Sequence, residues 1–149
     1  MKIGNVEFFT KKIIRGCDGR GDGDSPYLTR VSIWRSLRGS CYLHKFHRSD
    51  ADDLHDHPWA FVSIILWRGY LEETEERLLD GTPVRVQRRY WPGSILYRPA
   101  TWKHRVVLVD DRPAFTLVFT GAVARHWGFW VDHVWVPWRE YFRQKGCKE

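Results

Sequence analysis

Short runs of apolar and β-branched residues recur along the chain, and turn residues bound each of them. Runs rich in valine, isoleucine, threonine and aromatic side chains are typical of strands. Glycine, proline and aspartate separate these runs, for example at 80–83 and 110–113. Seven or more short strands with such turns predict an all-β fold, an antiparallel sandwich or barrel. The predicted strands are 27–35, 40–46, 59–67, 84–90, 94–97, 104–109 and 115–120.

The end of the chain departs from this pattern. Pro137 suits the first position of a helix, and Trp138, Tyr141 and Phe142 follow at spacings of three and four. This spacing places the three rings on one face of a helix. We therefore expect a short amphipathic C-terminal helix that packs on the β-structure or on a partner.

Composition narrows the class of protein. The 149 residues are enough for one domain, spanning 1–149, and leave no room for a second. Nine tryptophans, eight phenylalanines and six tyrosines exclude a disordered chain and indicate large rings lining a core or a cavity. The opening residues lack a signal-like apolar segment, and no stretch approaches the roughly 20 apolar residues of a membrane span. We therefore expect a cytoplasmic protein without a membrane partner.

The cysteines also agree with the expectation of a cytoplasmic protein. Cys17, Cys41 and Cys147 are odd in number and far apart, with no C-x-x-C pair. This spacing fits a reducing compartment and argues against a thiolate metal site. We assign none of the three a role.

The segment His55-Asp56-His57, with His104 much further along the chain, carries the strongest chemical signal. Side chains at i and i+2 of an extended segment project to the same side, so His55 and His57 present their nitrogens together. Three imidazoles brought together by strands can bind zinc, copper, iron or nickel. Without a thiolate, they leave coordination positions open to water or substrate, as a catalytic metal requires.

The spacing around these histidines resembles the two sequence motifs of the cupin superfamily. The first motif has the form G-x5-H-x-H-x3/4-E-x6-G, and the second G-x5-P-x-G-x2-H-x3-N. The resemblance covers about 49–108 of this chain. The residues at the family spacing are His55, His57, Gly69, Gly93, Pro99 and His104.

Four motif positions differ from the family. They are Ser49 for the first glycine, Val62 or Phe61 for the glutamate ligand, Thr101 for the second-motif glycine and Leu108 for the asparagine. The resemblance implies a double-stranded β-helix, the cupin jelly-roll barrel, with three histidine ligands and no family carboxylate. Some cupins with three histidines, including thiol dioxygenases, are metal enzymes, and others have lost the metal.

Two other side chains could complete the ligand set. Asp53 has the same alternation parity as His55 and His57, so its carboxylate could replace the missing glutamate. His44 precedes the motif on the previous strand, and adjacent strands of a barrel can aim side chains into one cavity. Asp56 should point away from the site and orient a histidine from outside the ligand set.

The chain is basic, with a net charge of +6. Such a field can steer an anionic small molecule toward the protein. Between 85 and 112 the basic residues outnumber Asp110 and Asp111, and they are Arg85, Arg88, Arg89, Arg98, Lys103, Arg105 and Arg112. Arg98 is the expected binding group, because a guanidinium beside the metal can hold a carboxylate or phosphate through two hydrogen bonds.

Three functional hypotheses follow. The leading one is a metal-dependent cupin enzyme in which His55, His57 and His104 hold the catalytic ion, with a non-haem Fe(II) oxygenase acting on a small polar or anionic molecule favoured. Zn, Mn and Ni are the other candidate ions. The second hypothesis is a non-catalytic ligand-binding or regulatory module. The third is a metal-free sugar-nucleotide isomerase or epimerase with a histidine as general base.

Partners follow from the same reasoning. The expected partner is a small-molecule substrate. Nucleic acid is not expected, because the basic residues form neither a recognition helix nor an aromatic RNA-binding signature. A homodimer is expected by analogy with other jelly-roll proteins.

Overall fold

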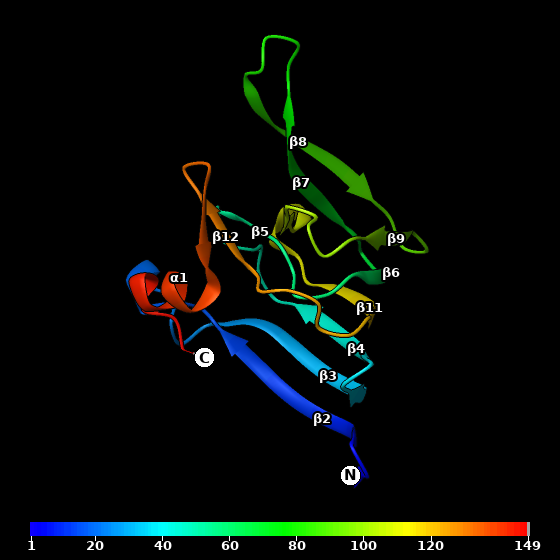
Figure 1. Ribbon diagram of the computed structural model, residues 1–149. Coiled ribbons are helices and arrows are strands. Elements are labelled where there is room, and N and C mark those ends of the chain that lie inside the picture. The colour runs from blue at the N-terminus through cyan, green and yellow to red at the C-terminus, as the bar shows by residue number, and fades with distance from the viewer. Residues whose placement is uncertain (149) are drawn as a thin grey trace.

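The structure, a computed structural model, describes residues 1–148 as two facing antiparallel β-sheets with a short C-terminal helix. In Figure 1, β2, β3 and β4 of the first sheet lie at the bottom, and β5, β7 and β12 of the second lie above them. The first sheet, in spatial order, is β1 (Lys2–Ile3), β2 (Val6–Arg15), β3 (Pro26–Ser36), β4 (Gly39–Phe46), β11 (Ala114–Thr120), β6 (Phe61–Trp67) and β9 (Ile95–Arg98). The second is β13 (Val134–Pro137), β12 (Gly128–Val131), β5 (Leu54–His55), β10 (His104–Val107), β7 (Tyr70–Arg77) and β8 (Pro83–Tyr90). Short 3-10 turns cover Asp18–Arg20 and Val109–Asp111.

The predicted strands are confirmed as β3, β4, β6, β8, β9, β10 and β11, each within two residues of its expected ends. The all-β prediction is therefore confirmed. Sequence reasoning missed β1, β2, β7, β12 and β13. The charges of β7, with four glutamates in eight residues, hid a strand that supplies buried side chains to the interior.

Alternation along the strands sets the inner faces of the sheets. In β11, the alternate residues Ala114, Thr116, Val118 and Thr120 are buried, while Phe119, between Val118 and Thr120, is exposed. Each large apolar side chain buried in this way stabilises the fold by about 1.5–3 kcal/mol. The main cluster between the sheets is Leu28, Phe46, Ile65, Tyr70, Leu96, Val106, Leu108 and Ala114. A smaller cluster of Tyr42, Phe61 and Val118, with Trp59 against it, lies beside the site described below.

Gly69, one of the glycines at the motif spacing, is required by geometry. It joins β6 to β7 with φ +73°, in the left-handed region that favours glycine. A Cβ there would meet the carbonyl oxygen of Tyr90 across the turn. Gly93, with φ +92°, needs the same freedom between β8 and β9.

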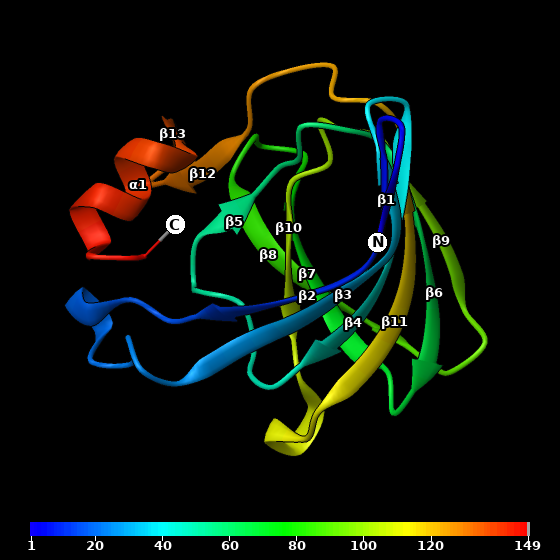
Figure 2. The same ribbon diagram turned by 90° about the horizontal axis from the view of Figure 1, so that it is seen from below.

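The predicted C-terminal helix is confirmed as α1 (Trp138–Lys145), which Gly146 ends in a left-handed conformation. It packs on the second sheet, because the Tyr141 ring stacks on Phe129 of β12 with centroids 3.8 Å apart. In Figure 2, α1 lies beside β12 and β13. Within residues 1–148, no helix is both long enough and apolar enough to cross a membrane.

The cysteines correct one expectation. Cys17 and Cys147, whose spacing fits a reducing compartment and to which sequence reasoning assigns no role, form a disulfide across 130 residues. The fold brings them together because the turn after β2 lies against the end of α1, where the amide of Asp18 donates to the carbonyl of Gly146 at 2.9 Å. Cys41 is a buried free thiol.

Candidate metal centre

Strand register places two of the three candidate histidines side by side on adjacent strands. His55 ends β5 and His104 begins β10, and the two are direct partners in the antiparallel ladder. Residues directly opposite each other project from the same face of a sheet. Both imidazoles therefore point into the interior, where their ring centroids lie 5.0 Å apart.

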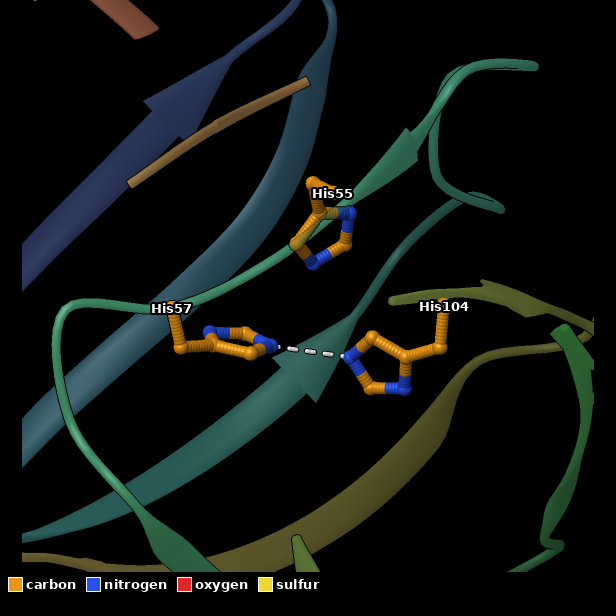
Figure 3. Close-up of side chains that lie close together, drawn as sticks. All are labelled: His55, His57 and His104. Carbon is orange, nitrogen blue, oxygen red and sulfur yellow. Dashed lines mark hydrogen bonds between the residues drawn. The ribbon is translucent and has the colours of Figure 1, made fainter. Parts of the chain in front are cut away.

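His57 completes the group from just beyond the end of β5. Its Nε2 lies 2.9 Å from Nε2 of His104, and its ring centroid lies 5.0 Å from that of His55. Figure 3 shows the three rings turned toward a common point, with the dashed line joining His57 to His104. One ring nitrogen from each residue lies within 4.8 Å of the other two.

This arrangement fits a divalent metal ion. Two imidazole nitrogens at about 2.1 Å from one ion and at right angles to each other would lie about 3.0 Å apart. The 2.9 Å separation of His57 and His104 matches that value. Three imidazoles also leave coordination positions free for other ligands.

The segment around His57 is held from several directions. Its backbone amide donates to the carbonyl of Ala100 at 3.0 Å. Its ring stacks on Trp59 with centroids 5.2 Å apart and meets the Phe61 ring edge-on at 4.6 Å. These contacts fix the imidazole although β5 itself ends at His55.

The buried environment favours the uncharged form of His55 and His57. Burial lowers the pKa of His55 well below 6.5, and the nearby His104 lowers it further. Burial also lowers the pKa of His57 well below 6.5, and the surrounding histidines and Arg30 add to the effect. Neutral imidazoles present the lone pairs that a metal ion binds.

Glu72 of β7 is the residue that sequence reasoning missed. It is 3% exposed, and its Oε1 accepts a hydrogen bond from Nδ1 of His104 at 2.6 Å. It also accepts from Arg98 and from the indole of Trp102. Burial alone would raise the pKa of Glu72, but the hydrogen bonds from His104 and Arg98 outweigh it and lower the pKa to about 2. A carboxylate in this position fixes the His104 tautomer, with Nε2 free toward the centre.

Asp50 is the second carboxylate near the centre. Its Oδ2 lies 3.9 Å from Nδ1 of His55 and accepts the backbone amide of Val106 at 2.6 Å. Tyr27 donates to its other oxygen. Burial raises the pKa of Asp50 to about 6, although the Val106 amide opposes this shift.

The two candidates for a fourth ligand lie outside the histidine group. Asp53 accepts a hydrogen bond from Tyr141 of α1 at 2.9 Å, because β5 begins only at Leu54 and the alternation does not extend back to Asp53. His44 of β4 accepts a hydrogen bond on Nε2 from Arg30 at 3.0 Å. Neither belongs to the group of converging nitrogens.

Asp56 points away from the centre, as expected, but orients no histidine. It accepts the backbone amide of Gly128 at 2.8 Å and the indole of Trp135 at 3.1 Å, and it pairs with Arg125. Its buried carboxylate therefore anchors β12 and β13 to the segment between His55 and His57.

Arg98 has partners other than the expected substrate. Its Nε and Nη2 donate to the two oxygens of Glu72 at 3.0 and 2.5 Å, and its Nη1 donates to the carbonyl of Tyr97. The guanidinium also lies over the Trp102 ring, 4.6 Å from its centroid. The expectation that Arg98 offers free donors to an anion is corrected, because the unforeseen Glu72 occupies them.

The basic stretch from 85 to 112 is largely neutralised. Each glutamate of β7 has a basic partner. The pairs are Arg98 with Glu72, Arg85 and Arg105 with Glu73, Lys103 with Glu75, and Arg88 with Glu76. The expected steering field on this face is therefore weaker than the sequence suggested.

Comparison with known proteins identifies the fold. No family model and no curated protein sequence matches the chain. Among solved structures, it is similar to the polyketide cyclase RemF from Streptomyces resistomycificus, at 16% identity and a TM-score of 0.53, over 81% of this chain and 79% of that one. It is also similar to a cupin-2 domain from Rhodospirillum rubrum, at 14% identity and a TM-score of 0.51, over 82% of this chain and 72% of that one.

A third likeness is partial. The DMSP lyase DddQ from Ruegeria pomeroyi DSS-3 matches at 23% identity with a TM-score of 0.44. The match covers 60% of this chain and 41% of the lyase, so the chain spans less than half of that enzyme. At their identities, the likenesses to RemF and to the cupin-2 domain show a shared fold and do not assign an activity.

Proposed function

We propose that this chain, which has the cupin superfamily fold, is a metal-dependent enzyme whose ion is held by His55, His57 and His104. Within that class, we propose a non-haem Fe(II) oxygenase that acts on a small anionic molecule. The observation that carries the proposal is the convergence of three imidazole nitrogens from β5, the segment after it and β10. Imidazole ligands with open positions suit redox-active iron as well as zinc.

Bound Fe(II) would supply adjacent coordination positions for a substrate group and dioxygen. The residues of the chain supply the rest of the site. Glu72 accepts the Nδ1 proton of His104 and so directs the Nε2 lone pair toward the centre. Trp59 and Phe61 cover the His57 ring and keep bulk water from that side. The apolar surface they present suits the hydrocarbon part of a small substrate.

The metal assignment is tested by elemental analysis of the whole chain purified without oxygen. The protein is reconstituted separately with Fe(II), Zn, Mn and Ni, and the metal bound per chain is measured. We expect about one ion per chain for wild type and for the control His126→Ala, whose side chain is exposed. We expect that His104→Ala loses the ion. Equal metal content in His104→Ala and wild type would contradict the proposal.

The oxygenase assignment is tested separately with nitric oxide as a probe for dioxygen. Fe(II)-loaded protein with an open coordination position gives a high-spin S = 3/2 electron paramagnetic resonance signal when nitric oxide binds. We expect this signal from wild type and His126→Ala. A metal-loaded protein without the signal would reject the oxygenase and leave the other metal chemistries.

One observation favours a second candidate function, a metal-free isomerase or epimerase. Such an enzyme requires one histidine with an orienting carboxylate, and His104 with Glu72 at 2.6 Å has that geometry. This candidate predicts that removal of metal by a chelator leaves ligand binding and turnover intact. The metal enzyme predicts that both His55→Ala and chelation abolish turnover.

A further inference from the structure

Arg30 of β3 lies on the interior face of the first sheet. Its neighbours two positions away, Leu28 and Ser32, are both buried, so alternation turns Arg30 inward as well. Its partner across the ladder is His44 of β4, and the partner of His44 on the other side is Thr116 of β11. Arg30, His44 and Thr116 therefore form one row of polar side chains across three strands.

The guanidinium of Arg30 is held in place but lacks a counter-ion. Its Nε donates to Nε2 of His44 at 3.0 Å, and its central carbon lies 4.7 Å from the centre of the Tyr42 ring. Among residues 1–148, no carboxylate lies within ion-pair distance of Arg30, and its two terminal nitrogens donate no hydrogen bond. Arg30 is partly buried, so these free donors remain accessible to an acceptor from outside the protein.

Thr116 supplies an independent observation. Its side chain is 1% exposed, and its hydroxyl has no hydrogen-bond partner. Leaving a buried hydroxyl unpaired costs free energy. Because Thr116 faces His44 across the ladder, this hydroxyl lies on the same interior face as Arg30. A ligand oxygen on this face can satisfy both groups.

This row of polar groups faces the histidine centre. The ring of His44 stacks on the Tyr42 ring, with centroids 5.7 Å apart. Tyr42, on which Arg30 lies, packs against Phe61, and Phe61 in turn contacts the His57 ring. An apolar wall thus connects the free guanidinium with the proposed metal ligands.

We propose that Arg30 and the Thr116 hydroxyl bind the carboxylate of a small carboxylic acid substrate, whose reacting end extends along Tyr42 and Phe61 toward the three histidines. This inference rests on the proposed function and names its substrate class. The two free terminal nitrogens of Arg30 can donate two parallel hydrogen bonds, which matches a planar carboxylate. One negative charge balances the single unpaired guanidinium, whereas a phosphate dianion would leave charge uncompensated.

The test uses the whole chain, both metal-free and loaded with zinc. The probes are acetate, propionate and butyrate, each with its matched amide, and binding is followed by chemical-shift changes and calorimetry. Inorganic phosphate forms a separate arm. We expect that at least one carboxylate binds metal-free protein and that its amide binds at least tenfold more weakly, because the charge-assisted hydrogen bonds are lost.

Three variants locate the site. Arg30→Gln should weaken carboxylate binding at least tenfold in both forms of the protein, and Arg30→Lys should restore it only in part because the fork of donors is lost. Thr116→Val, which keeps the buried volume and removes the hydroxyl, should weaken binding about threefold or more. The control Arg112→Gln removes an exposed arginine and should bind as wild type does. Circular dichroism checks that each variant is folded.

The outcomes separate this inference from the proposed function. Metal binding that requires His104, together with carboxylate binding that is unchanged in Arg30→Gln, overturns the inference alone. Carboxylate binding that requires Arg30 in a protein that binds no metal supports the inference and contradicts the proposed function. Binding of phosphate instead of carboxylates at Arg30, or of no probe at all, overturns the inference.

Discussion

Arg98 and Arg30 both belong to the first sheet, and they are in opposite situations. From the edge strand β9, Arg98 gives two hydrogen bonds to Glu72 of β7 in the facing sheet, and Glu72 in turn accepts from His104 of β10. From β3, Arg30 contacts His44 and has no carboxylate partner among residues 1–148. The first arginine completes a network within the protein, and the second leaves donors free.

This difference separates positioning from recognition. A paired guanidinium such as Arg98 stabilises the carboxylate that orients a metal ligand, and it has little left to offer a substrate. An unpaired one such as Arg30 is costly to bury and gains most from an incoming anion. Burial alone therefore does not reveal which arginine binds ligand, and the count of hydrogen-bond partners does.

The largest expected effect comes from breaking the hydrogen-bond network of Arg98, Glu72 and His104 at Glu72. Glu72→Gln should lower the free energy of unfolding by about 3–5 kcal/mol, because it leaves Arg98 partly buried without its counter-ion. It should also weaken metal binding about 10–100-fold, because the orienting carboxylate of His104 is lost. Urea unfolding and metal titration measure the two effects. Glu140→Gln, in an exposed helix pair, is the control and should change neither.

The arginines themselves give the sharpest contrast. Arg98→Met should destabilise the protein by about 3 kcal/mol, because Glu72 then keeps a buried charge without its ion pair. Arg30→Met should change stability by less than about 1 kcal/mol, because removal of an unpaired buried charge offsets the lost hydrogen bond to His44. Both are measured by urea unfolding of metal-free protein. Equal destabilisation by the two variants would contradict the comparison.

The partners of the two arginines, His44 and Glu72, should also lose their contributions to stability in different pH ranges. Burial lowers the pKa of His44 well below 6.5, so its contribution to stability is complete above pH 6.5 and is lost as the pH falls below that value. Between pH 7.5 and 5.5 this loss is about 1 kcal/mol. The pKa of Glu72 is lowered from 4.5 to about 2, so its contribution is complete above pH 4.5 and is lost between pH 4.5 and 2.

Unfolding of metal-free wild type and His44→Gln at several pH values tests this separation. The side-chain carbonyl of glutamine can still accept from Arg30 but does not titrate in this range. We expect a smaller loss of stability between pH 7.5 and 5.5 in His44→Gln than in wild type. The same loss in both proteins would show that His44 does not titrate as proposed.

The smallest effect is expected at an exposed ion pair that contacts neither Arg30 nor Arg98. Arg88 pairs with Glu76 at 2.7 Å, but both side chains are about half exposed. Exposed pairs contribute little, so Arg88→Gln should change stability by less than about 0.5 kcal/mol and leave metal binding unchanged. A larger effect, measured by the same urea unfolding and metal titration, would mean that Arg88 is energetically coupled to the other basic residues between 85 and 112.

Local rules predicted the strands and the grouping of His55 with His57. Extended-chain parity predicts that the two histidines lie on one side, and the contacts of His57 with Trp59 and Phe61 hold its ring there beyond the end of β5. The same parity rule failed for Asp53, because β5 is only two residues long and regular alternation does not reach that position. It also said nothing about Glu72, which lies within a run of charges that resembles an exposed segment.

The sequence by itself determined the β-rich fold, the C-terminal helix and the pair of histidines, because these depend on side-chain period and residue preference over a few neighbours. Only the tertiary structure decided that Glu72 meets His104 across 32 residues and that it accepts hydrogen bonds from Arg98. The same is true of the free donors of Arg30. Which charges meet depends on the register between distant strands, and that register is set by packing of the whole interior.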